Sequence, residues 1–174
     1  MAEPFGTARG DWAPYCAALS GIAATLLGLL FVSVSLRLNL FRDAEIADVR
    51  DFATLIFGQY LTVVVMGLLT LFPRAPAATL GGTALVLSAL NLTWVLITGR
   101  QYLRLNPTRE TRAGWALLLG AGGLATTAAL MGSGLLLLTG DAVGALPWLA
   151  GTELAMLVSA TVGAWVLLTH ARPS

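Results

Sequence analysis

The chain has 174 residues, of which 57% are hydrophobic and only 11% are charged, with ten basic residues against nine acids. A soluble domain carries roughly 25% charged residues, so these charges are too few to cover a soluble globule, and the near-neutral balance excludes the large basic face that nucleic-acid binding requires. One cysteine, Cys16, and one histidine, His170, exclude an internal disulfide, a structural zinc site and a bis-histidine haem site.

Five stretches carry at most one charge each, and they cover 12–36, 52–73, 75–99, 113–140 and 142–171. Each exceeds the roughly 20 residues that a helix needs to cross about 30 Å of hydrocarbon. The first lacks the layout of a cleaved signal and is expected to stay in the mature chain. We predict an all-α, polytopic membrane protein with a single domain and five transmembrane helices in a compact bundle. The expected helices cover about 12–38, 44–72, 76–104, 107–139 and 145–170.

Short connections predict two antiparallel hairpins. Segment 73–76, which reads Pro-Arg-Ala-Pro, joins the second and third helices, and its prolines end one helix and open the next. Segment 140–144, which reads Gly-Asp-Ala-Val-Gly, joins the fourth and fifth, with Pro147 in the first turn of the last helix. Asn106 and Pro107 are typical of a helix start and place the beginning of the fourth helix.

The ten basic residues are all arginines, and they are distributed unevenly between the two sides of the membrane. With five crossings, Arg9 and Arg74 fall on one side and the other eight on the opposite side. Cationic loops stay in the cytoplasm, so the amino terminus is predicted outside and the carboxyl terminus inside. Aromatic residues form matching belts, with Trp12, Tyr15 and Trp148 outside and Trp94, Tyr102, Trp115 and Trp165 inside. The eight cytoplasmic arginines, expected to meet anionic headgroups, are Arg37, Arg42, Arg50, Arg100, Arg104, Arg109, Arg112 and Arg172.

Arginine in place of lysine, together with abundant Ala, Gly and Leu, suggests a high-GC bacterial source. The inner membrane is then the expected location. This inference rests on composition alone.

The first loop gathers four acids, Asp43, Glu45, Asp48 and Asp51. Asp43 can cap a helix that begins near residue 44, where the positive end of the helix dipole favours acids. Mixed charges on a helix face are usually a solvated surface. The functional alternative is an acidic ring that concentrates cations at the cytoplasmic mouth of a pore.

Small residues four apart predict where the helices approach closely, because lipid tails leave little hydrophobic drive to pair helices. The fourth and fifth helices each carry such a seam, and the two seams are predicted to pack together. The seams comprise Ala121, Ala125, Ala129 and Ser133 on one helix and Gly151, Ala155, Ser159 and Gly163 on the other.

Glu153 is an acid deep within a membrane helix, roughly 12 Å below a helix start at residue 145. It is predicted to point away from the fourth helix, toward the first helix, a neighbouring subunit or water, with Ser20 and Ser133 at similar depth. One interpretation is a hydrogen-bonded carboxyl that fixes packing, through Ser20 or a backbone carbonyl. The other is a binding position for a proton or cation, since buried acids in membranes are costly and commonly functional.

Gln59 and Asn91 form a second polar pair, because an antiparallel hairpin brings them to similar height. They are predicted to hydrogen-bond to each other. Such a pair is a structural clamp, or a neutral constriction if it lines a pore.

No catalytic motif is present, and Cys16 and His170 are expected near opposite membrane faces, so an enzyme is not predicted and neither is a metal or cofactor. Three functions stay open. The first is a homo-oligomeric channel or pore for cations or protons, with subunits meeting on an axis. The second is a non-conducting accessory or scaffold protein. A small secondary transporter is the third, weakened by the odd helix count.

Overall fold

The computed structural model describes residues 4–36, 47–105 and 122–170, and every regular element among them is helical. Each of the five helices is long and apolar enough to cross a membrane. The prediction of an all-helical chain with five candidate membrane spans is therefore confirmed. The elements are α1 (Pro4–Leu36), α2 (Ala47–Leu71), α3 (Ala77–Leu105), α5 (Ala125–Thr139) and α6 (Ala142–His170), with one π-helical turn at 122–124 before α5.

Two helix starts differ from the prediction. α1 begins at Pro4 and not near residue 12, because proline suits the first turn of a helix, where its missing N–H has no acceptor. α6 begins at Ala142, where the Asp141 carboxylate accepts a hydrogen bond from the Gly144 amide at 3.1 Å. Pro147 is consequently inside α6 and not in its first turn. The predicted start at Asn106 lies outside the described residues.

The two short connections are tight turns. Between α2 and α3, Arg74 adopts a left-handed φ of 59°, and the Ala75 amide donates to the Phe72 carbonyl at 3.3 Å. Between α5 and α6, Gly140 has a φ of 109°, which glycine adopts without the penalty that a Cβ would bring. Both predicted hairpins are present, and the helices of each are in contact.

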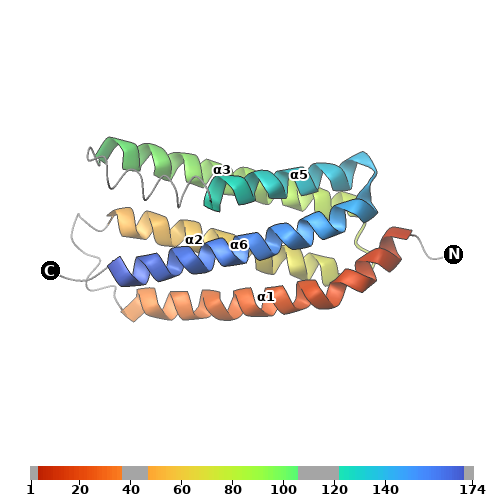
Figure 1. The fold of residues 1–174 in the computed structure, drawn as a ribbon, viewed down its shortest axis with the longest axis horizontal. Coiled ribbons are helices and arrows are strands. Elements are labelled where there is room, and N and C mark those ends of the chain that lie inside the picture. Colours follow the sequence, from red (N-terminus) through yellow and green to blue (C-terminus); the bar gives the residue numbers. More distant parts are fainter. Residues whose placement is uncertain (1–3, 37–46, 106–121, 171–174) are drawn as a thin grey trace.

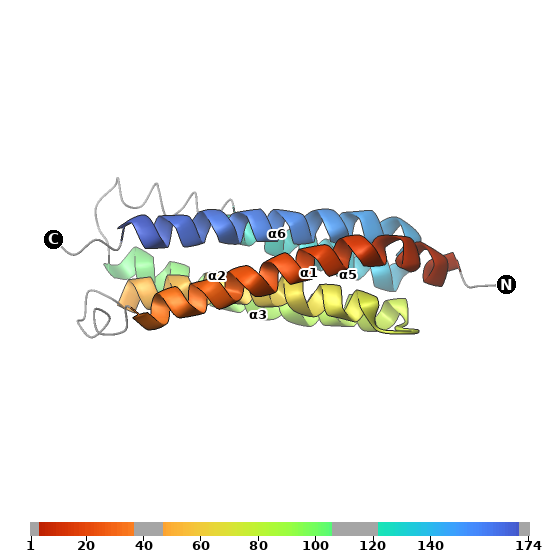
Figure 2. The same ribbon diagram turned by 90° about the horizontal axis from the view of Figure 1, so that it is seen from below.

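The helices lie alongside one another along the long axis of the molecule (Figure 1). Two layers can be followed in the views, with α3 and α5 together and α1 beside α2 and α6 (Figures 1 and 2). α2 contacts both layers, and so does α6. We call the end where α1 begins and both short connections lie the turn end.

The backbones of α3 and α5 approach each other closely at a pair of glycines. A methyl group placed on Gly81 would lie 2.9 Å from the Gly134 carbonyl oxygen, and one on Gly134 would lie 3.0 Å from that of Gly81. α1 and α2 meet in a similar way, because a methyl group on Gly67 would collide with the Ser20 hydroxyl. Glycine at these crossings lets the helices approach more closely than any side chain would permit.

The predicted seam between α5 and α6 is wrong for most of its described members. Ala125 and Ala129 on α5 are exposed, and so are Gly151 and Ala155 on α6. Gly163 is buried and Ser159 is half-buried, whereas Ala121 lies outside the described residues. α5 and α6 meet at Ser133, which is a buried member of the predicted seam, and at Thr152, which lies on a neighbouring face of α6. Spacing identified small-residue faces but not which of them turns inward.

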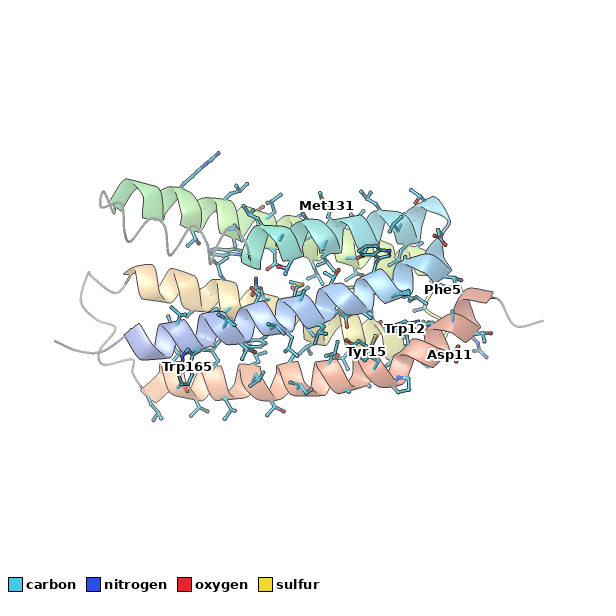
Figure 3. The ribbon with its side chains drawn as sticks, viewed as in Figure 1. Phe5, Asp11, Trp12, Tyr15, Met131 and Trp165 are labelled. Atoms are coloured by element: carbon cyan, nitrogen blue, oxygen red, sulfur yellow. The ribbon has the colours of Figure 1, made fainter. Side chains whose placement is uncertain are left out.

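The outer surface is apolar and carries aromatic residues toward both ends. Trp12 and Tyr15 lie near the turn end, and Trp165 lies toward the opposite end (Figure 3). Trp148 and Trp165 are 69% and 70% exposed. Large apolar side chains on so apolar a surface would be unfavourable in contact with water. The arrangement suits helices whose sides face lipid. The side chains of Tyr102 and Trp115 are outside the described part.

The glycine crossing can be tested by adding single methyl groups. We expect Gly81→Ala and Gly134→Ala each to lower the free energy of unfolding by about 1–3 kcal/mol, because the backbones must separate. The matched controls Gly82→Ala and Gly132→Ala have nothing within 4 Å and should be neutral or slightly stabilising. Unfolding of the detergent-solubilised protein by heat or dodecyl sulfate measures all four. Equal effects at the two kinds of position would contradict the close crossing.

Candidate functional site

Glu153 is completely enclosed by the protein. It lies about 16 Å along α6 from the first residue, deeper than predicted because the helix begins earlier. Its side chain is 0% exposed, and neither carboxyl oxygen has a hydrogen-bond partner in the part of the chain that the structure describes. Burying such a group without hydrogen bonds costs about 1–3 kcal/mol even when it is protonated, and far more when it is charged.

The carboxyl lies toward α1, one of the three directions expected from the helix geometry. The Cys16 thiol on α1 is close enough to interact electrostatically with Glu153, and it also lies near the Thr70 hydroxyl on α2. Cys16 is 2% exposed and Thr70 is 2% exposed. Three helices thus contribute one polar group each to an enclosed cluster, which we call the α1–α2–α6 cluster: Cys16, Thr70 and Glu153. Cys16 had been expected near the membrane face and away from any site.

Ser20, predicted as a partner of Glu153, belongs to the same α1–α2 contact but points to the backbone of α2. Its hydroxyl lies 3.4 Å from the Val63 carbonyl oxygen and 3.5 Å from that of Val64. Ser20 is buried against Gly67, whose missing side chain creates the space for it. Ser20 therefore holds α1 against α2 and leaves the carboxyl without a hydroxyl donor.

Ser133 also faces a residue other than Glu153. Its hydroxyl donates to the Ala129 carbonyl at 2.8 Å and lies 3.5 Å from the hydroxyl of Thr152. Thr152 precedes Glu153 on α6, so the two neighbours point to different helices. Ser133 is thereby a contact between α5 and α6.

The amide clamp predicted between α2 and α3 exists, but the prediction named the wrong residue on α2. Asn91 donates one N–H to the Thr62 hydroxyl at 2.9 Å and the other to the Leu87 carbonyl at 3.0 Å. Gln59, the expected partner, is half-buried one turn away. Both donors of Asn91 are thus occupied, and Thr62 closes the clamp.

A further polar contact joins α2 to α6 beyond the cluster. The Tyr60 and Thr161 hydroxyls are 3.1 Å apart. Between this pair and Glu153 the buried side chains of the two helices are apolar apart from Thr62, which contacts Asn91 on α3. They include Val63, Met66, Met156 and Ala160. The carboxyl is therefore separated from the far end of the molecule by apolar packing.

The acidic mouth predicted for the first loop is only partly within the described residues. Asp43 and Glu45 lie outside them. Asp48 and Asp51 belong to the first turns of α2, and their side chains are not among those described. Within the described part, no group of three or more His, Cys, Asp and Glu side chains could hold a metal ion.

The chemistry open to the cluster follows from its composition. A carboxyl and a thiol can each take up or release a proton, and a hydroxyl can donate or accept a hydrogen bond beside them. A dehydrated metal cation would need about six oxygen ligands or several soft ones, which these three groups do not supply. The cluster is therefore a protonatable centre within the protein.

Sequence reasoning missed Cys16, Thr70 and Thr62 as members of these contacts. A signal for Cys16 was available, because Arg9, Ala13, Cys16 and Ser20 recur at helical spacing and share one face of α1. Hydroxyl residues gave less information, since threonines in membrane helices commonly bond to their own backbone, as Thr62 and Thr70 do.

Removal of the unpartnered carboxyl should stabilise the protein. We expect Glu153→Met to raise the free energy of unfolding by about 1–3 kcal/mol, because an apolar side chain avoids the cost of a buried carboxyl without hydrogen bonds. The contrasting control is Tyr60→Phe, which removes a hydroxyl that has a partner and should destabilise by about 1 kcal/mol. Thermal unfolding in detergent measures both. A large loss of stability in Glu153→Met would mean that the carboxyl fixes the packing.

No protein-family model, curated protein or solved structure matches the chain. The described residues form five helices that are long and apolar enough to span a membrane.

Proposed function

We propose that this chain is a multi-pass protein of the inner membrane that passes protons or small cations, with Glu153 as the group that binds them. The observation that carries this proposal is the enclosed, unpartnered carboxyl. Its burial costs free energy that no hydrogen bond among the described residues offsets. Acids in such positions within membrane helices commonly mark ion or proton pathways.

Of the two kinds of ion, the geometry favours the proton. Cys16 and Thr70 supply one sulfur and one hydroxyl beside the carboxyl, too few ligands for a bare sodium or calcium ion. A proton needs only the carboxyl itself and a path for water or hydroxyl groups to approach. The described conformation encloses the carboxyl, so passage would require α1, α2 and α6 to move relative to one another.

The same enclosure changes where the path is proposed to run. Glu153 is buried within a single chain, so the path would lie inside each subunit and not on an axis between subunits. A compact homo-oligomer remains part of the proposal. The outward-facing Ala125, Ala129, Gly151 and Ala155 support it, because small residues permit close approach of a neighbouring helix.

The alternative function is a non-conducting accessory or scaffold protein. The burial of Glu153 against α1 favours it, since a site sealed by packing on every side need never open. Under this alternative the carboxyl would affect stability alone, and the exposed small residues would serve contact with another membrane protein.

Proton flux distinguishes the two functions. We expect the full-length protein in phosphatidylethanolamine–phosphatidylglycerol liposomes, loaded with a pH-sensitive dye and driven by a potassium diffusion potential, to pass protons. Glu153→Gln should reduce this flux to the leak of empty liposomes, because the amide cannot bind and release a proton at neutral pH.

Thr98→Val is the matched control for this experiment. The Thr98 hydroxyl on α3 is likewise buried with no hydrogen-bond partner in the described structure. Thr98→Val therefore removes a buried, unpartnered polar group at a different place in the protein. Flux should persist in Thr98→Val. Wild-type flux no greater than that of empty liposomes would sink the conducting function and leave the scaffold.

The proposed orientation places the amino terminus outside and the carboxyl terminus in the cytoplasm, where eight of the ten arginines would meet anionic headgroups. A fluorescent protein fused to the carboxyl terminus should therefore fluoresce in bacterial cells, because it folds to a fluorescent state in the cytoplasm. A protease-sensitive tag at the amino terminus should be cleaved from the periplasmic side. The opposite pattern would reverse the orientation and place the turn end in the cytoplasm.

A further inference from the structure

We infer that the first turns of α1, residues 4–13, form a hinged arm that closes the turn end of the α1–α2–α6 cluster and is held shut by Arg9. This inference rests on the proposed function, because it concerns access to Glu153. It adds a regulatory contact that involves neither the carboxyl nor its immediate neighbours.

Arg9 joins the arm to the α2–α3 turn. One guanidinium nitrogen, Nη1, donates to the Phe72 carbonyl at 3.1 Å and to the Ala75 carbonyl at 2.9 Å. These carbonyls lie at the carboxyl end of α2 and in the turn beyond it, where the helix dipole is negative and a cation is stabilised. Hydrogen bonds from a charged donor each contribute about 1.5–3 kcal/mol, a range that allows a contact to form and to open.

A hinge lies directly after the arm. Pro14 is inside α1 and has no N–H to donate to the Gly10 carbonyl one turn earlier. Gly10 has open space around it, with nothing within 4 Å of a methyl group placed there. Figure 1 shows the amino-terminal end of α1 turning away from the line of the rest of the helix. Proline is the commonest cause of such a bend, and the missing hydrogen bond lets the two parts rotate.

The arm and the cluster share one face of α1. At 100° per residue, Arg9, Ala13 and Cys16 project within about 60° of one another, toward α2. Arg9 is about 10 Å from Cys16 along the helix axis, and the half-buried Trp12 and Ala13 lie between them, one turn before Cys16. Because Cys16 neighbours both Thr70 and Glu153, lifting the arm would uncover the cluster from the turn end.

The charge of Arg9 and the packing of the arm both hinder access to Glu153. A guanidinium stays protonated at every pH that a cell meets, so it holds a fixed positive charge over the approach to Glu153. Opening the arm would withdraw this charge and the covering side chains together. The latched arm would thus keep protons and other cations from the carboxyl, and release of Arg9 would admit them.

Cys16 reports the opening of the arm, since it is the one cysteine in the chain. Wild-type protein in sealed liposomes is treated from outside with two small membrane-impermeant methanethiosulfonates, one cationic and one anionic. We expect slow modification of Cys16 in wild type. Arg9→Gln should increase the rate about tenfold or more with both reagents, because the latch loses its charged donor. Cys16→Ser is the blank.

Two controls separate opening from simple loss of charge. Arg74→Gln removes a positive charge from the same turn and leaves the Arg9 contacts in place, so it should not accelerate the modification by both reagents. Loss of repulsion alone would raise the rate with the cationic reagent and lower it with the anionic one, and that pattern in Arg9→Gln would overturn the latch. Arg9→Lys keeps the charge with a poorer fit to two carbonyls and should give intermediate rates, which preserves the test if Arg9→Gln does not fold.

The latch and the proposed function can fail separately. If wild type passes protons and Glu153→Gln does not, but Arg9→Gln is modified at the wild-type rate, the latch is wrong and the function stands. If Arg9→Gln opens Cys16 but wild type passes no protons, the contact is a structural latch and the inference that it controls proton access is overturned. The latch and the proposed function are both supported if Arg9→Gln accelerates the modification of Cys16 and raises the proton flux.

Discussion

Close contact between helix backbones is the constraint on which the rest of this structure depends. Hydrocarbon gives apolar helices little reason to associate, so they are held by contacts that form only where side chains are small. Gly81 meets Gly134 between α3 and α5, and Gly67 meets Ser20 between α1 and α2. The second of these crossings brings Cys16 and Thr70 close together and fixes one wall of the space that encloses Glu153. Steric fit at Gly67 thus shapes the surroundings of a carboxyl on a third helix.

The buried position of Glu153 lowers the stability of the protein, and the proposed function depends on that same position. A carboxyl without hydrogen bonds is a poor element of packing, and better ones are present in the same protein, such as Thr62 with Asn91 and Tyr60 with Thr161. Strained or unsatisfied groups concentrate where a protein must bind or react. A group whose hydrogen bonds are all made must break one of them before it can exchange its partner. The Glu153 carboxyl has no such bond to break among the described residues.

Much of the architecture could be predicted from the sequence because it depends on local chemistry. The five spans followed from charge scarcity, and both short connections from Pro73, Pro76 and Gly140. Helical geometry predicted that Glu153 points away from α5, and it left α1, a neighbouring subunit or water as the side that the carboxyl faces. Helix starts were less predictable where the chain offers more than one proline or aspartate that can begin a helix, as at Pro4 and Asp141.

Helix rotation could not be predicted, because it depends on contacts between segments that are distant in the sequence. Gly151 and Ala155 carry the same spacing signal as residues at a real crossing, yet they face outward. The choice of Thr62 over Gln59 as the partner of Asn91 has the same origin, since the two differ by less than one helical turn. Arg9 could be assigned to a membrane face by its charge, but its carbonyl acceptors became evident only once the α2–α3 turn was placed beside α1.

The α1–α2–α6 cluster also has a consequence for biogenesis. Its members come from the first, second and last of the five helices, and α6 contacts both α1 and α2. During synthesis α1 and α2 can pair as soon as they enter the membrane, whereas the helix that carries Glu153 is made after all the others. The face of α1 and α2 that will receive it must wait among lipids or against the insertion machinery. Correct insertion of the last helix therefore decides whether this polar centre is assembled at all.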